Sequence, residues 1–444
     1  MKAPDEDPQN AGSAAPTGLR SADAGAEGSA PTDVASVRKS HTGDGRGKSK
    51  KRRRRRRGPV YAPGTGPRTA ARIEAAAPGP ASPATATAAD VAPGSSPVET
   101  RGQRQPSFYG ALDLGTNNCR LLVAVPREQG FRVVDAFSRI VRLGEGVGQT
   151  GRLGDAAMAR AIEALKVCGQ KLAYRDVTRV RMIATEACRT AVNGAEFIAR
   201  VRDEAGLELE IVSRETEARL AVAGCASLVD PNAAGVILFD IGGGSSELVW
   251  LDLGAREDER RRRVSDRIRE WVSLPVGVVT LSERHGGRDV SSVQFEAMVA
   301  EVAVMLEAFP NVAVLDAAVA SGAVHMLGTS GTVTTLAGVH LGLPRYDRRM
   351  VDGTWLSGSR VAELVTLFVG MDYEARCANP CIGRERADLV LAGCAILEAI
   401  RRRWPCDRLR VADRGLREGV LVEMMSEDGV WSGRHRRRAG DRRG

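Results

Sequence analysis

The sequence has no long apolar run. Across its 444 residues, no stretch of about 18 uncharged apolar residues occurs, which is what a membrane-spanning helix requires. The N-terminus, Met1–Asp7, carries acidic residues where a secretory signal has a basic and then an apolar segment. We therefore expect a soluble, cytoplasmic protein with no membrane contact. Because 43% of the residues are hydrophobic, the chain can bury a core, and a wholly disordered protein is excluded.

Cysteine is sparse, and its spacing forms no metal-binding pattern. The eight cysteines are scattered along the chain. The closest two, Cys377 and Cys381, have no second pair at zinc-finger spacing and no histidine nearby. We interpret the cysteines as buried, reduced thiols. A redox or metal role stays open, but the sequence does not support it.

Large apolar residues are nearly absent from residues 1–107, so we predict that this segment is a disordered tail. It holds 18 basic and 10 acidic residues, and ten of the twelve residues in Arg46–Arg57 are basic. This block is either a solubilising tail without a specific partner or an electrostatic contact for RNA, DNA or polyphosphate. No aromatic residue lies among the arginines, which argues against base stacking. A second disordered basic tail is expected over 429–444.

The body between the tails has a slight excess of acidic residues and the pattern of an α/β protein. We predict strands over 109–113, 119–125, 131–138, 179–184 and 208–212, with helices over 156–171, 196–205 and 215–226. The pattern then restarts with strands over 235–240, 247–253 and 270–273. A helix over 294–307, a strand over 317–320 or 323–327, and a helix over 389–400 follow. We therefore expect two related domains, 108–228 and 229–428, with a cleft between them.

Each predicted domain begins with an apolar strand, an aspartate and a glycine-containing turn. The two aspartates, Asp113 and Asp240, lie 127 residues apart. Glycine allows successive backbone N–H groups to converge on an anion, and neighbouring polar side chains add donors. We predict phosphate binding rather than two purely structural turns, and the residues involved are Gly115, Thr116, Asn117, Asn118 and Arg120 in the first turn and Gly242, Gly243, Gly244, Ser245 and Ser246 in the second.

Two further features belong to the predicted phosphate site. Asp240 and Glu247 flank the second hairpin, and Asp113 could join them from the first; hard oxygen ligands of this kind suit Mg²⁺, although one of them could instead cap its own turn. A third cluster, Gly328, Thr329, Gly331 and Thr332, follows an apolar strand and opens a predicted helix. Its N–H groups would face an anion, unless it is an ordinary capped turn.

These motifs together resemble the exopolyphosphatase and guanosine pentaphosphate phosphatase (Ppx/GppA) family. Eight segments match in order and cover nearly all of 108–425: Leu112–Arg120, Ala184–Arg189, Val212–Leu220, Asp240–Glu247, Leu274–Gly277, Gly328–Thr332, Arg384–Asp388 and Asp413–Gly419. The resemblance implies two ribonuclease H-like domains of the actin-like and acetate-kinase-like ATPase superfamily. It also implies a short member, because long members continue into a helical, HD-type C-terminal region and this sequence does not.

The resemblance implies roles for single residues. Glu217 matches the base that activates the attacking water, and Arg189 matches the arginine that neutralises the transferred phosphoryl group. Asp240 and Glu247 match the metal-binding acids, so Mg²⁺ or another divalent cation is expected. Three departures are mild: Thr116 and Asn118 stand where serine is common, and Thr216 stands where an acid often precedes the base.

The implied activity is Mg²⁺-dependent release of terminal orthophosphate from inorganic polyphosphate, conversion of pppGpp to ppGpp, or both. The alternative is a sensor that binds a guanosine polyphosphate or nucleotide, with RNA-binding tails and little catalysis; Glu217 and Arg189 argue against it. A kinase of the same superfamily is a third hypothesis, but nothing outside the phosphate loops suggests an acceptor site. Whether the chain forms a homodimer stays open.

Overall fold

A computed structural model describes residues 107–254 and 263–431. Both halves of the body fall within the described residues, apart from 255–262 in the second half. The predicted N-terminal tail, with its Arg46–Arg57 block, lies outside them up to residue 106, and the C-terminal tail lies outside them from residue 432. Trp431, at the start of the predicted C-terminal tail, is described: its indole N–H donates to the Arg127 carbonyl at 3.0 Å.

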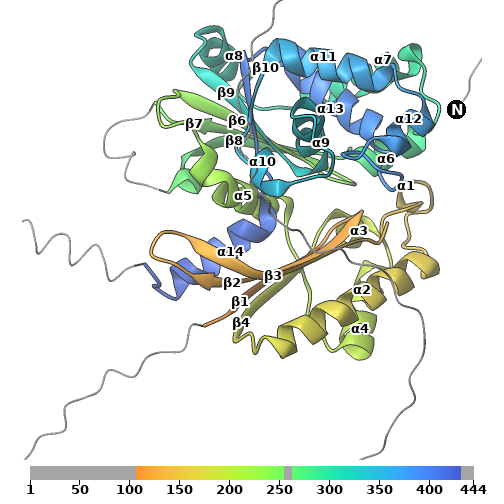
Figure 1. Cartoon of the computed structure of the whole chain (residues 1–444), viewed down its shortest axis with the longest axis vertical. Coiled ribbons are helices and arrows are strands. Elements are labelled where there is room, and N and C mark those ends of the chain that lie inside the picture. Colours follow the sequence, from red (N-terminus) through yellow and green to blue (C-terminus); the bar gives the residue numbers. More distant parts are fainter. Residues whose placement is uncertain (1–106, 255–262, 432–444) are drawn as a thin grey trace, which may run out of the picture. The chain divides into compact units, whose positions relative to one another are not determined.

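The first half alternates strands and helices as expected (Figure 1). Its elements are β1 (Tyr109–Leu114), β2 (Asn118–Pro126), β3 (Phe131–Ile140), α1 (Val147–Thr150), α2 (Asp155–Tyr174), β4 (Arg179–Ala184), α3 (Glu186–Thr190), α4 (Gly194–Ala205), β5 (Glu210–Ile211), α5 (Arg214–Cys225) and η1 (Ala226–Leu228). The strand predicted over 208–212 is reduced to the two residues of β5. Helix α4 ends at Gly206, which has a left-handed conformation (φ 65°) that glycine adopts without strain.

The second half repeats the hairpin and adds more helices. Its elements are β6 (Gly235–Ile241), β7 (Ser246–Asp252), η3 (Val264–Arg267), β8 (Ile268–Leu274), α6 (Val278–His285), α7 (Ser292–Leu306), α8 (Val312–Ala320), β9 (Val324–Thr329), α9 (Ser330–His340), α10 (Arg348–Val351), β10 (Trp355–Ser357), α11 (Gly358–Val369), α12 (Tyr373–Ala378), α13 (Val390–Arg403), β11 (Arg408–Val411) and α14 (Leu416–Glu427). Of the two positions considered for one strand, 323–327 corresponds to β9, whereas 317–320 is wrong because it forms the end of α8.

The two sheets share one strand order. The first sheet runs β3-β2-β1-β4-β5, and the second, read from its β8 edge, runs β8-β7-β6-β9-β11-β10. In each sheet the opening three strands are antiparallel, and the next strand joins the first one in parallel, β4 to β1 and β9 to β6. This confirms the expected α/β fold with two related ribonuclease H-like halves.

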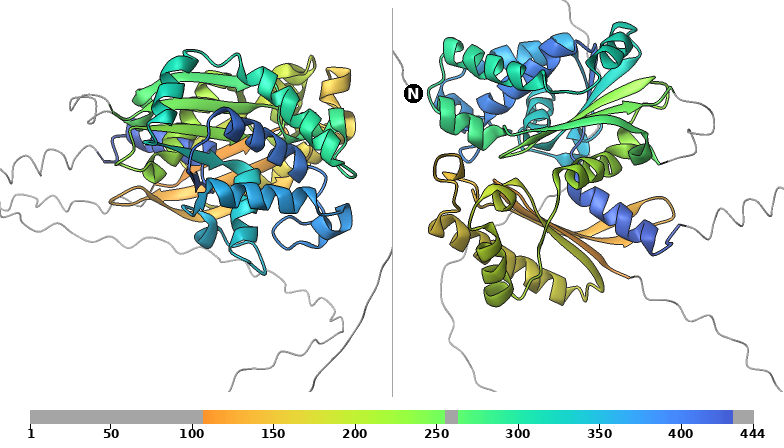
Figure 2. Two further views of the ribbon diagram at one scale, coloured as in Figure 1. Left: turned by 90° about the horizontal axis from the view of Figure 1, so that it is seen from above. Right: turned by 180° about the vertical axis from the view of Figure 1, so that it is seen from behind.

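Alternation along the strands explains how each sheet buries both faces. In β1, Leu112 and Leu114 face a core shared with α2 and α4, whereas Tyr109 and Ala111 face a core shared with α14. The second sheet is covered on one face mainly by α7, α9, α11 and α13, as Figure 2 shows from a second side. Its other face packs against α5. The region where α5 meets both sheets is therefore continuous with the cores of both halves.

Helix α14 follows the last strand of the second sheet but packs against the first. Its buried residues Val420 and Leu421 share a core with Tyr109 of β1 and Leu220 of α5. Helices α5 and α14 lie side by side between the two sheets in both figures. The domain boundary expected between residues 228 and 229 falls between η1 and β6, and α14 crosses back over it.

The segment 384–388 precedes α13 as a turn rather than as part of a helix. Arg142, from the loop after β3, forms a salt bridge with Asp388 at 2.9 Å, so this turn contacts the first half. In the described residues no helix is both long and apolar enough to cross a membrane. All eight cysteines are free thiols, and six of them are buried.

Candidate active site

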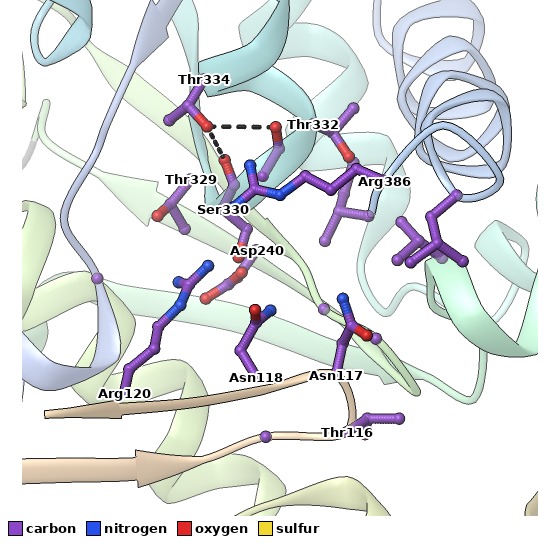
Figure 3. A pocket seen from close by; sticks show the side chains of 18 of the residues that line it. Thr116, Asn117, Asn118, Arg120, Asp240, Thr329, Ser330, Thr332, Thr334 and Arg386 are labelled. Carbon is purple, nitrogen blue, oxygen red and sulfur yellow. Dashed lines mark hydrogen bonds between the residues drawn. The ribbon is translucent and has the colours of Figure 1, made fainter. Parts of the chain in front are cut away.

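A cavity of about 740 Å³ opens where the two halves meet (Figure 3). Its walls come from the β1–β2 turn, the β6–β7 turn, the start of α9, the start of α5 and the segment that leads into α14. The cleft predicted from the duplicated pattern is therefore present, and most of the predicted phosphate-binding residues line it.

The first turn is held rigidly by backbone hydrogen bonds. The Gly115 N–H donates to the Asn118 carbonyl at 2.9 Å, and the Asn117 carbonyl accepts from the N–H groups of Val141 and Arg142. The side-chain amide oxygens of Asn117 and Asn118 are buried and find no hydrogen-bond partner within the described residues. Figure 3 shows both amides directed into the cavity. Buried polar atoms without a hydrogen-bond partner indicate a place where a ligand supplies the missing partner.

The second turn needs its glycines because it touches the first turn. A Cβ on Gly243 would lie 2.8 Å from the Cβ of Thr116, and one on Gly244 would lie 2.8 Å from the Thr116 hydroxyl. No side chain fits at such distances. The turn is also tied to α6, because the Gly242 and Gly243 carbonyls accept from the N–H groups of Val278 and Val279. The two predicted phosphate turns thus form one continuous wall.

The third cluster begins α9 as predicted. Thr329 ends β9, which pairs in parallel with β6 so that Thr329 is level with Asp240. Ser330, the first residue of α9, has φ 76°, a conformation that is costly for a residue with a side chain. The Thr329 hydroxyl donates to the Arg414 carbonyl at 2.6 Å, which fixes the start of α9 against the segment before α14.

Four carboxylates with predicted roles line this cavity, Asp113, Glu217, Asp240 and Glu247; Glu247 is buried and the other three are partly buried. Asp240 and Glu247 are directly opposite in the β6–β7 ladder, so they lie side by side as the hairpin pattern predicted. Burial raises the pKa of Asp113 to about 6. Burial and then the charge of Asp240 raise the pKa of Glu247 to about 7. Burial also raises the pKa of Asp240 above its ordinary value.

Glu217 is held by Arg189, the other residue for which a catalytic role was expected. Glu217 lies in the first turn of α5, which begins after the Ser213 cap. Its Oε2 accepts from Nη2 of Arg189 at 3.0 Å. Burial, followed by the charge of Glu247, raises the pKa of Glu217 well above its ordinary value, although Arg189 opposes this shift. Arg189 itself does not line the cavity, because protein acceptors surround its guanidinium group.

Two predicted phosphate-binding residues lie outside the cavity wall. The Ser246 hydroxyl is fully buried and donates to the Val276 carbonyl at 2.7 Å. A Cβ on Gly328 would lie 2.6 Å from the Phe239 ring, so this glycine allows the close packing of β9 on β6. Both residues support the loops from behind. A motif alone did not distinguish them from their neighbours, because in a strand alternate residues face opposite sides.

Sequence reasoning did not single out Arg386 and Arg417, which are two of the arginines that line the cavity. Like the predicted Arg120, they form no ion pair within the described part of the chain. Arg386 is in the turn before α13, and Arg417 is in the first turn of α14, where burial lowers its pKa. Both stand inside segments that matched the family motif, which was the available signal. Three unpaired guanidinium groups suit a densely charged anion.

The carboxylates of the cavity are the candidate donors for a metal ion. In the described residues, no group of three or more His, Cys, Asp or Glu side chains is arranged to hold a metal ion by itself. Glu247 uses Oε1 to accept from the hydroxyls of Ser245 and Ser273, both at 2.8 Å. Carboxylates with raised pKa values fit a divalent ion that takes one or two protein oxygens and completes its shell with phosphate oxygens and water.

Comparison with known proteins agrees with the geometry. A sequence profile of the Ppx/GppA phosphatase family matches residues 122–428. The chain is 30% identical over 328 residues to a protein named exopolyphosphatase 2 from Mycobacterium tuberculosis (strain ATCC 25618 / H37Rv), and the match covers 71% of this chain and 97% of that protein.

Two solved structures are similar as well. A Ppx/GppA family member from Aquifex aeolicus has a TM-score of 0.58 at 28% identity, covering 73% of this chain and 99% of that chain. An exopolyphosphatase-like protein has a TM-score of 0.63 at 27% identity, and the match covers 72% of this chain and 99% of that chain. These matches span nearly the whole of each relative, so the HD-type extension of long members has no counterpart in them. The chain belongs to the Ppx/GppA phosphatase family.

Proposed function

We propose that the protein is a phosphohydrolase that removes terminal orthophosphate from inorganic polyphosphate, from pppGpp, or from both. The single observation that carries this proposal is the position of Glu217, a partly buried carboxylate in the wall of the same cavity as the two phosphate turns. A site that only sensed the ligand would not need a carboxylate there, since it repels a phosphate but can accept a proton from water.

The reaction needs few groups. The oxygen of a water molecule attacks the terminal phosphorus while a proton of that water passes to Glu217, and the bridging P–O bond breaks. The products are orthophosphate and a substrate shortened by one phosphate. Arg189 keeps Glu217 in place, and Arg120, Arg386 and Arg417 attract the phosphate oxygens.

The proposed cofactor is Mg²⁺ or another divalent cation. Asp240, Glu247 and Asp113 are the residues that would hold it, because their carboxylates line the same cavity. When bound, such an ion supplies positive charge to the phosphate oxygens. It would also relieve the mutual repulsion of carboxylates, which contributes to the raised pKa of Glu247.

A direct test measures phosphate release from polyphosphate of several lengths and from pppGpp, side by side, with Mg²⁺ and with a chelator. The Glu217→Gln variant should lose most turnover, about 10²- to 10⁴-fold, while still binding substrate, because only proton acceptance is lost. Glu215→Gln is the matched control, since Glu215 is an exposed acid on the same helix. Full turnover by Glu217→Gln would refute the assignment of the base, and binding without phosphate release by the unmodified protein would favour a sensor.

The Arg46–Arg57 block is proposed as a tether for long polyphosphate. It is a dense basic segment, and such segments attract phosphate polymers by releasing counterions, so the attraction weakens as salt rises. Much of the excess positive charge of the chain lies in this tail, whereas the cavity relies on a few local arginines. The tether would raise the local substrate concentration without taking part in the reaction.

A further inference from the structure

Glu186 is a buried carboxylate in the cavity wall to which the reaction described above assigns no role. It is the first residue of α3, and only 6% of its surface is exposed. Two arginines use it as their common acceptor. Arg189 donates through Nε at 3.0 Å and through Nη2 at 2.6 Å to its Oε2, and Arg214 donates through Nη2 at 2.7 Å to its Oε1. A carboxylate held by two guanidinium groups has a fixed orientation.

The bonds of Arg189 show what Glu186 controls. Its Nη1 donates to the Val212 carbonyl at 2.5 Å, and its Nη2 is shared between Glu186 and Glu217. Glu186 therefore accepts from two of the three nitrogens of this guanidinium group. Without Glu186, Arg189 would keep only the carbonyl and Glu217, and the planar group could turn about its side chain. The 3.0 Å contact with Glu217 depends on the plane that Glu186 sets.

Arg214 and the second phosphate turn fix Glu186 itself. Arg214 is the first residue of α5 and lies three residues before Glu217 on that helix, so Glu186 is tied to the element that carries the proposed base. On its other side, a Cβ on Gly244 would lie 3.1 Å from Cγ of Glu186. The carboxylate is thus held between α5 and the β6–β7 turn, with little room to move.

We propose that Glu186 is a positioning residue: it orients Arg189, and Arg189 in turn holds Glu217 toward the cavity. The inference rests on the proposed function, because it assumes that Glu217 accepts the proton of the attacking water. It also changes the role implied for Arg189. A guanidinium group that three protein acceptors occupy holds the base rather than the transferred phosphoryl group.

The test compares Glu186→Gln with the control Glu215→Gln in the full-length protein, using inorganic polyphosphate and pppGpp as probes. Glu186→Gln keeps the side-chain volume but loses the charge. We expect kcat to fall by about 10- to 100-fold, the size of effect seen when a catalytic group is misplaced by about 1 Å. KM should stay within about twofold, because no substrate contact is removed. Glu186→Asp, which keeps the charge, should recover part of kcat.

A double variant separates positioning from a general loss of structure. If Glu186 acts through Arg189, Glu186→Gln combined with Arg189→Ala should lose no more kcat than Arg189→Ala alone. The proposal would be overturned if the double variant showed the product of the two single losses in kcat. It would also be overturned if Glu186→Gln had the same kcat as the control Glu215→Gln. Should Glu186→Gln fail to fold, Glu186→Asp takes its place in the same comparison.

Two readouts keep this proposal distinct from the proposed function. A crystal structure of Glu186→Gln should show Arg189 moved away from Glu217, and an unchanged contact would overturn the proposal whatever the substrate is. Glu217→Gln is measured in parallel. An active Glu217→Gln refutes the base and the positioning role together, whereas an inactive one beside a fully active Glu186→Gln refutes the positioning role alone.

Discussion

The crossing of α5 and α14 is expected to tolerate no side chain at Gly419. In the interior of α14, a Cβ on Gly419 would lie 2.0 Å from the Leu220 carbonyl oxygen of α5. The approach is reciprocal, because a Cβ on Gly224 of α5 would lie 1.9 Å from the Gly415 carbonyl oxygen. Both obstacles are backbone atoms, which cannot turn aside as a side chain can. Gly419→Ala must therefore separate the two helices.

The size of the effect follows from these distances. Real Cβ contacts below 3.0 Å essentially do not occur, so the backbones must part by about 1 Å at Gly419. Overpacking of this kind costs about 1–3 kcal/mol, against a gain of up to about 1 kcal/mol from replacing glycine by alanine within a helix. We expect a net loss in the free energy of unfolding. We also expect lower kcat/KM, by about tenfold or more, because α5 carries Glu217 and α14 carries Arg417.

The measurements are urea denaturation and phosphate release by Gly419→Ala, with Gly169→Ala as the matched control. Gly169 is also inside a helix, α2, but a Cβ there meets nothing closer than 3.4 Å. The control should be as stable as the unmodified protein or more stable by up to about 1 kcal/mol, with unchanged activity. If Gly419→Ala behaves like Gly169→Ala, then the close crossing does not position the two helices and our reasoning is wrong.

Two other predictions concern pH and salt. The buried His325 donates from Nδ1 to the Met326 carbonyl, accepts the Asp230 N–H at Nε2, and has its pKa lowered by burial from 6.5. The unfolded state therefore binds a proton at this histidine more tightly than the folded state does. The stabilisation that neutral His325 provides is complete above about pH 6.5, and it is lost as the pH falls through the lowered pKa. Urea denaturation at several pH values should show that the free energy of unfolding declines less on acidification for His325→Leu than for the unmodified protein. An equal decline in the two proteins would contradict the prediction. Deletion of residues 1–105 should weaken binding of long polyphosphate at low salt and leave that of short chains unchanged, whereas unchanged affinity for long chains would remove the tether.

The expectations from sequence were most reliable where a pattern depends on neighbouring residues. An apolar strand followed by an aspartate and a glycine turn predicted both hairpins, and the Asp240–Glu247 pair is directly opposite in the ladder as the spacing suggested. Local pattern was weaker for the segment 317–320, because a short apolar run fits a buried strand and a helix equally well. It ends α8 instead of forming a strand.

Contacts between distant segments could not be predicted in this way. The charged groups of Arg386 and Arg417 face the cavity only because a turn and a helix late in the chain return to the first half. Ser246 and Gly328 have the residue types of a phosphate loop, yet the packing of β6, β7 and β9 directs them away from the cavity. Arg189 was expected to face a phosphate, but in the fold its partners are protein oxygens.

The sequence by itself determined most elements of the first half, the duplicated hairpin and the kinds of group that could bind phosphate, because these depend on local backbone preferences and on side-chain chemistry. The tertiary structure alone decided which of those groups share one cavity. It did so through the crossing of α5 and α14, where two glycines allow backbone contact between segments about 200 residues apart. Such proximity comes from packing, and no local pattern encodes it.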